Sequence, residues 1–72
     1  MAAITKLESA ITGLGLTPQA VLVNQDGSKV EGYMVVIKEA EDLVELMRRT
    51  HDLDVAFSPH PETDDVFVIW LR

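Results

Sequence analysis

Apolar residues recur every three or four positions near the start of the chain, which is the period of a helix. One stripe is formed by Ile4, Leu7, Ile11 and Leu14. Glycine accepts the left-handed conformation that ends many helices, so Gly13 and Gly15 mark its end. The pattern predicts a helix over about residues 3–13. Two starts fit: a capping box from Thr5 to Glu8, or a start one turn earlier at Ala2 or Ala3.

Two runs of strand-forming residues flank Asp26-Gly27, a dipeptide typical of a type I′ hairpin turn. Such a turn pairs Gln25 with Ser28. One face of the hairpin then collects Val21, Val23, Val30, Met34 and Val36. The other face mixes polar and apolar residues: Leu22, Asn24, Lys29, Glu31, Tyr33, Val35 and Ile37. Because a core face is apolar, we predict that the valine-rich face packs in the core.

A second helical stripe follows the hairpin, and two further strands follow that stripe. The predicted inner side of this helix consists of Leu43, Leu46, Met47 and Thr50. Acidic residues crowd its first turn and arginines its last, which suits the helix dipole. Residues 53–58 alternate like a half-buried strand that ends at Pro59. Residues 65–71 form the last strand, in which Val66 to Leu71 are all apolar.

The order α-β-β-α-β-β in a single domain, residues 1–72, resembles a circularly permuted ferredoxin-like domain. That resemblance rests on the order of the elements. It implies an α+β two-layer sandwich with two helices on one face of an antiparallel sheet, whose strand order is 3-4-2-1. The apolar last strand is then central, and the shorter or more polar first and third strands are edges. An open meander with the same neighbours is the alternative.

The last strand offers apolar residues to both faces of the sheet, because successive side chains alternate. Whichever set meets the helices, the other lies on a face that no helix covers. A sheet face exposed to water is normally polar. We therefore predict that a second copy of the chain or another protein covers it, through an interface that includes Leu22, Tyr33, Val35 and Trp70.

Composition narrows the classes of partner. Twelve acids against six bases give a formal net charge of −6, which disfavours direct binding of nucleic acid. The chain has no cysteine, so disulfides and thiolate zinc sites are excluded. No signal peptide is recognisable and no apolar run is long enough to span a membrane, so we expect a cytoplasmic protein.

Catalytic and metal-binding patterns are weak. His51 and His60 do not stand at the spacing of a known metal motif, and no serine has a base beside it in the pattern of a nucleophile. We predict no enzymatic activity, no metal and no cofactor. Acidic residues cluster late in the chain and predict a docking patch for a basic surface, formed by Asp52, Asp54, Glu62, Asp64 and Asp65.

These patterns indicate a small, acidic, non-catalytic protein-interaction or regulatory module that dimerises or docks through its open sheet face. In size and charge it resembles small acidic proteins of phages and mobile elements that inhibit nucleic-acid-binding proteins, such as anti-defence proteins. The alternative is a regulatory domain that binds a small ligand at a dimer interface, near Tyr33 and Trp70.

Overall fold

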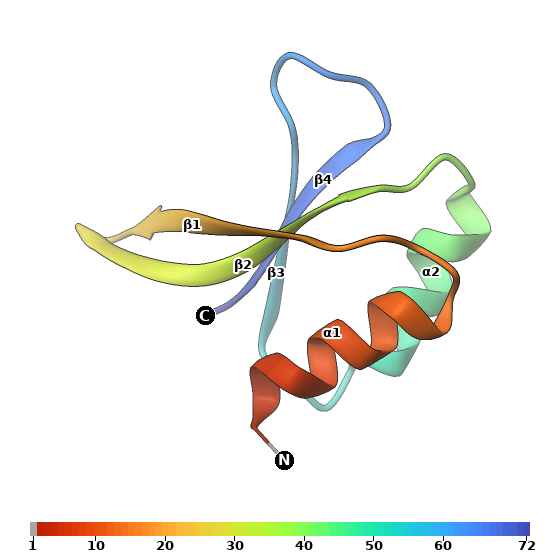
Figure 1. Cartoon of the computed structure of the whole chain (residues 1–72), viewed down its shortest axis with the longest axis horizontal. Coiled ribbons are helices and arrows are strands. Elements are labelled where there is room, and N and C mark those ends of the chain that lie inside the picture. Colours follow the sequence, from red (N-terminus) through yellow and green to blue (C-terminus); the bar gives the residue numbers. More distant parts are fainter. Residues whose placement is uncertain (1) are drawn as a thin grey trace.

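The strands of this protein form one antiparallel sheet in the order β1-β2-β4-β3, as predicted. The computed structural model describes residues 2–72, apart from the side chain of Gln25. Its elements are α1 (Ala3–Gly13), β1 (Gln19–Gln25), β2 (Ser28–Val36), α2 (Ala40–Arg49), β3 (Val55–Pro59) and β4 (Val66–Leu71) (Figure 1). The sheet is twisted, so β1 and β3 run in clearly different directions. The predicted fold class, a two-layer α+β sandwich of permuted ferredoxin-like order, is confirmed.

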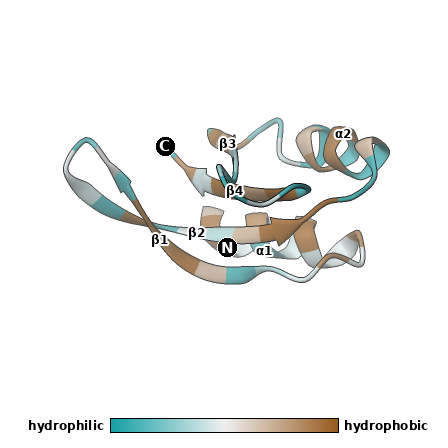
Figure 2. Ribbon diagram, turned by 90° about the horizontal axis from the view of Figure 1, so that it is seen from above, coloured by the Kyte–Doolittle hydropathy of each residue, from teal (hydrophilic) through white to brown (hydrophobic). Residues whose placement is uncertain are grey.

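The β1–β2 hairpin has the predicted turn and register. Asp26 and Gly27 have φ angles of 51° and 81°, as a type I′ turn requires. Gln25 pairs with Ser28, and the ladder continues to Met34. Polar residues gather at the tip of this hairpin and hydrophobic ones nearer the body of the sheet (Figure 2).

Helix α1 begins at the earlier of the two predicted starts. Ala2 is its N-cap, and its carbonyl accepts the N–H groups of Thr5 and Lys6, both at 3.1 Å. The capping-box alternative is therefore wrong, since Thr5 lies inside the helix. At the other end, the N–H of Gly15 bonds the carbonyl of Thr12 at 3.0 Å, and Gly15 has a φ of 79°. This is the helix end that glycine favours.

Replacing Gly13 with alanine should stabilise the domain. A methyl group at Gly13 would lie 3.2 Å from Nη1 of Arg49, which is the movable tip of a long side chain. Alanine is the better helix former, so we expect the free energy of unfolding to rise by about 0.5 kcal/mol in urea titrations. Gly15→Ala is the matched control. Its positive φ should make the same change destabilising, and an equal gain at both positions would contradict this account.

Both helices pack on the same face of the sheet. The residues buried between the two layers are Leu7 and Ile11 of α1, Leu46 of α2, Val35 of β2, Ile37, and Ile69 of β4. Thr50 closes one end of this core, and its hydroxyl donates to the carbonyl of Leu46 at 2.8 Å. Met47 was predicted on the inner side of α2 but is 45% exposed, because Leu43, Leu46 and Thr50 alone complete that stripe.

The predicted assignment of the hairpin faces is wrong. Val35 is 1% exposed beneath the helices, whereas Val36 on the opposite face is 50% exposed. The reason is the reach of the hairpin. Its tip extends beyond both helices (Figure 1), so Lys29 and Glu31 stay in water although they share a face with Val35. Charge at the tip therefore does not tell which face the helices cover.

Candidate interaction surface

The sheet face without helices is apolar along β1, β2 and β4, whereas β3 contributes Ala56 and Ser58 to it. The register of the ladders assigns to it these described side chains: Val21, Val23, Val30, Met34, Val36, Ala56, Val66, Val68 and Trp70. We call this surface the open face. The polar residues on the open face, among the strand residues whose side chains are described, are Gln19, Ser28 and Ser58. None of the described strand side chains on this face is charged.

Trp70 organises the middle of the open face. It stands opposite Gly32 in one ladder and opposite Ala56 in the other. Gly32 is buried, and a methyl group there would lie 3.0 Å from Cβ of Trp70 and 3.2 Å from Cγ2 of Val23. The indole Nε1 is buried without a hydrogen-bond partner. The ring therefore packs over its small neighbours, and its N–H is not presented to a ligand.

A shallow depression of about 400 Å³ extends the open face towards the β3–β4 loop. Its lining consists of Thr17, Gln19, Met34, Val36, His60, Thr63 and Val66. Nδ1 of His60 accepts the N–H of Glu62 at 3.2 Å, which holds the imidazole within its own loop. The depression thus joins apolar strand residues to a polar rim.

The four residues predicted for the interface do not lie together. Trp70 is on the open face, but Tyr33 and Val35 are on the face that the helices cover. Val35 is buried in the core, so its assignment to an exposed interface is wrong. Leu22 is 67% exposed, on the helix side of β1 but beyond the reach of the helices. The valines of the open face were missed as a surface because their continuous apolar pattern was interpreted as a core.

Tyr33 links the sheet to α1. Its hydroxyl donates to Oε2 of Glu8 at 2.9 Å. Burial raises the pKa of Tyr33 above its ordinary value of 10.0, and the hydrogen bond to Glu8 and the negative charges of Glu8 and Glu31 raise it further. The neutral phenol is thus the form that the folded state favours. Tyr33 contributes stability below the unfolded pKa, and this contribution is lost as the pH rises through the folded pKa.

Glu8→Gln should lower the pKa of Tyr33 towards its ordinary value, because it removes the nearest negative charge. The chain has one tyrosine, so tyrosinate absorbance reports this group alone. The control is Glu41→Gln on α2, which should leave the titration unchanged. Equal midpoints for all three proteins would show that Glu8 does not interact with the phenol in solution.

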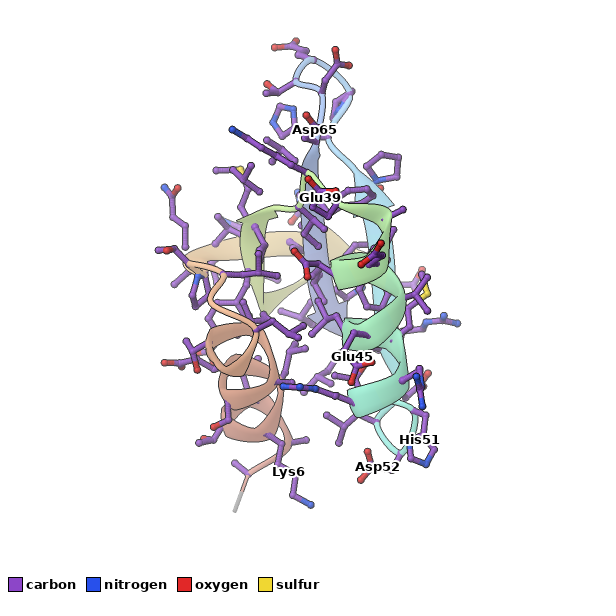
Figure 3. All side chains as sticks on the ribbon, turned by 90° about the vertical axis from the view of Figure 1, so that its right-hand side faces the viewer. Lys6, Glu39, Glu45, His51, Asp52 and Asp65 are labelled. Carbon is purple, nitrogen blue, oxygen red and sulfur yellow. The ribbon has the colours of Figure 1, made fainter. Side chains whose placement is uncertain are left out.

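The five predicted acidic residues fall into two groups at opposite ends of β3. Asp52 and Asp54 precede this strand, whereas Glu62, Asp64 and Asp65 lie in the loop that follows it. Figure 3 shows Asp52 and Asp65 at opposite ends of the molecule. Asp54 is also paired with Arg72, at 3.8 Å between Oδ1 and Nε. The prediction of one continuous docking patch is therefore wrong.

The histidines take part in local backbone contacts. Nδ1 of His51 lies 2.8 Å from the carbonyl of Arg48, at the C-terminal end of α2. Within residues 2–72, no three histidine, aspartate or glutamate side chains come together in a way that would hold a metal ion. Across the same residues, neither helix has the length and apolar character needed to cross a membrane.

No protein-family model matches the chain, and comparisons with curated proteins and with solved structures return no significant match.

Proposed function

We propose that this protein is a small, non-catalytic interaction module that binds another protein through its open face. The observation that supports this most is the chemistry of that face. It is apolar along β1, β2 and β4, and the described strand residues bring no charged side chain to it. The formal net charge of the whole chain is −6. Water-facing sheet surfaces are normally polar, and extended apolar surfaces mark contact sites.

An apolar partner surface fits this face better than a basic one. An acidic protein that docks by charge presents its carboxylates at the contact. Here the described carboxylates nearest β3 lie beyond its two ends, and Asp54 among them is paired with Arg72. These carboxylates favour solubility of the chain. Burial of the open-face valines and Met34 against the partner supplies the free energy of binding.

The small-ligand alternative depended on one site near both Tyr33 and Trp70. Tyr33 and Trp70 lie on opposite faces of the sheet, so they cannot line one site. The depression beside Val36 and His60 is shallow and lies at the rim of the open face. It is better suited to receive one side chain of a protein partner than to enclose a ligand.

Two valines of similar exposure provide the test. Val36 is 50% exposed on the open face, and Val44 is 55% exposed on α2. Affinity capture with tagged Val36→Glu should lose the partner that the unchanged chain retains, whereas Val44→Glu should retain it. Both variants should keep the melting temperature within a few degrees, because neither buries the new carboxylate. Equal capture by both variants would overturn the proposal.

A further inference from the structure

The outer edge of β1 is a second surface with unused bonding groups. In a two-residue hairpin the residues that flank the turn, here Gln25 and Ser28, exchange both backbone hydrogen bonds. The antiparallel ladder then alternates, so the N–H and C=O groups of Ala20, Leu22 and Asn24 point away from β2. The same alternation is seen along β2, whose odd-numbered residues point their backbone groups away from β1 and towards β4. The N–H of Ile37 accordingly donates to the carbonyl of Asp65 at 2.7 Å.

Between the flanking residues Pro18 and Asp26, this edge strand lacks the charge and proline that keep sheet edges apart. Natural edge strands are short, charged or interrupted by proline. The other edge strand, β3, follows these rules: it has five residues, ends at Pro59, and is preceded by Asp54 in its pair with Arg72. In contrast, β1 has seven residues, none of them charged and none of them proline. Its central side chain, Leu22, is 67% exposed.

The sequence of β1 is nearly symmetric about Leu22. It reads Gln-Ala-Val-Leu-Val-Asn-Gln, so Gln19 matches Gln25 and Val21 matches Val23. A strand that pairs antiparallel with its own copy places residues at equal distances from the centre opposite each other. Such pairing therefore sets valine against valine on the open face, which is a favourable cross-strand pair.

We propose that β1 pairs with β1 of a second copy, antiparallel and centred on Leu22, to give a continuous eight-stranded sheet. Leu22 then lies opposite Leu22 of the second copy, and Ala20 opposite Asn24. These are the residues whose backbone groups point outward, so each pair exchanges hydrogen bonds in both directions. The twofold axis is perpendicular to the sheet. Both open faces therefore lie on the same side and form one surface of double length, still available for the proposed protein partner.

The chain has no cysteine, so single cysteines can report the register. Leu22→Cys should form a disulfide-linked dimer under mild oxidation, because the paired Cα atoms would be about 5.5 Å apart. Ala20→Cys and Asn24→Cys should each cross-link poorly, since each residue lies about 13 Å along the strand from its own copy. A mixture of these two variants should cross-link much faster than either variant alone, because each mixed dimer places its two cysteines opposite each other. Val44→Cys is the control for random collision.

Charge variants test the same pairing without a covalent bond. Light scattering should give twice the chain mass for the unchanged protein and the monomer mass for Leu22→Lys and for Leu22→Glu. An equimolar mixture of these two variants should recover the dimer, because the opposite charges face each other across the axis. Leu22 is exposed, so both variants should fold.

A monomeric unchanged protein at high micromolar concentration would overturn the β1 pairing. A dimer that persists in Leu22→Lys would also overturn it, and a loss of that dimer in Val36→Glu would then assign dimerisation to the open face. The proposed function is tested separately, because loss of the partner in Val36→Glu does not depend on the mass of the complex.

Discussion

Replacing Val35 with glutamate should strongly destabilise the domain, whereas the same replacement at Val36 should change its stability little. Val35 is 1% exposed in the core between the two helices and the sheet, and Val36 is 50% exposed on the open face. A carboxylate at Val35 has no cation close by in that core, so we expect a loss of at least about 3 kcal/mol. Domains of this size have roughly 4–11 kcal/mol of stability in total. At Val36 the loss should stay below about 1 kcal/mol.

Circular dichroism and urea titration distinguish the two variants directly. Val35 and Val36 are adjacent valines of the same strand and receive the same new side chain. Any difference in the stability of the two variants therefore arises from the face of the sheet that each position occupies. Similar stability losses at both positions would show that both faces of β2 are buried in solution. A larger loss at Val36 would show that the helices cover the opposite face.

Replacing Gly32 with alanine should destabilise the protein, although alanine usually suits a strand better than glycine does. A methyl group at Gly32 would lie 2.7 Å from the backbone oxygen of Ile69 and 3.0 Å from Cβ of Trp70. The oxygen belongs to the central ladder and cannot move aside as a flexible side chain does. We expect a loss of about 1–3 kcal/mol in the free energy of unfolding.

Thermal melts of Gly32→Ala and Gly13→Ala provide a comparison of opposite sign. The first should lower the melting temperature and the second should raise it slightly. The fluorescence of Trp70, the one tryptophan of the chain, should shift in Gly32→Ala because the indole must move. An unchanged melting temperature together with an unchanged spectrum would mean that the strands separate easily at this point.

Much of the fold was predictable because it depends on local chemistry or on simple exclusion. Asp26-Gly27 determines the turn, and the turn determines the register of β1 with β2. The unbroken apolar run of β4 predicts a strand with a neighbour on each edge, which is a position in the middle of the sheet. Pro59, together with the short length of β3, predicts an edge.

The orientation of the sheet was not predictable in the same way. Both faces of β2 carry apolar residues near α2, so local hydrophobicity does not select one of them. The choice depends on how far the helices reach along the hairpin, which is a property of tertiary packing. Glu31 suggested a solvent face, yet Tyr33 and Val35 on that same face meet the helices.

The candidate surface follows from that orientation. Once Val35 is in the core, Val36 and the valines of β1 and β4 are left uncovered by the helices. The sequence predicted that one apolar face would remain open, but it left open which side of β4 belongs to that face, and it grouped Trp70 with Tyr33 and Val35 of the opposite face. We did not predict from the sequence that Leu22 is the centre of an edge strand without charge or proline, although the near symmetry of β1 about Leu22 can be seen in the printed sequence.

The central place of β4 also determines the order in which the protein can fold. The β1–β2 hairpin closes locally, but Tyr33 must pair with Ile69, which lies beyond α2 and β3 in the chain. Contacts of such long range are slow to form because a large loop must close first. Until β4 docks, β2 and β3 have no partner on the sides that face each other, because the sheet places β4 between them. A partly folded chain in which β4 has not yet docked therefore carries unpaired strand edges next to an unfilled core, and it is then most open to misassociation.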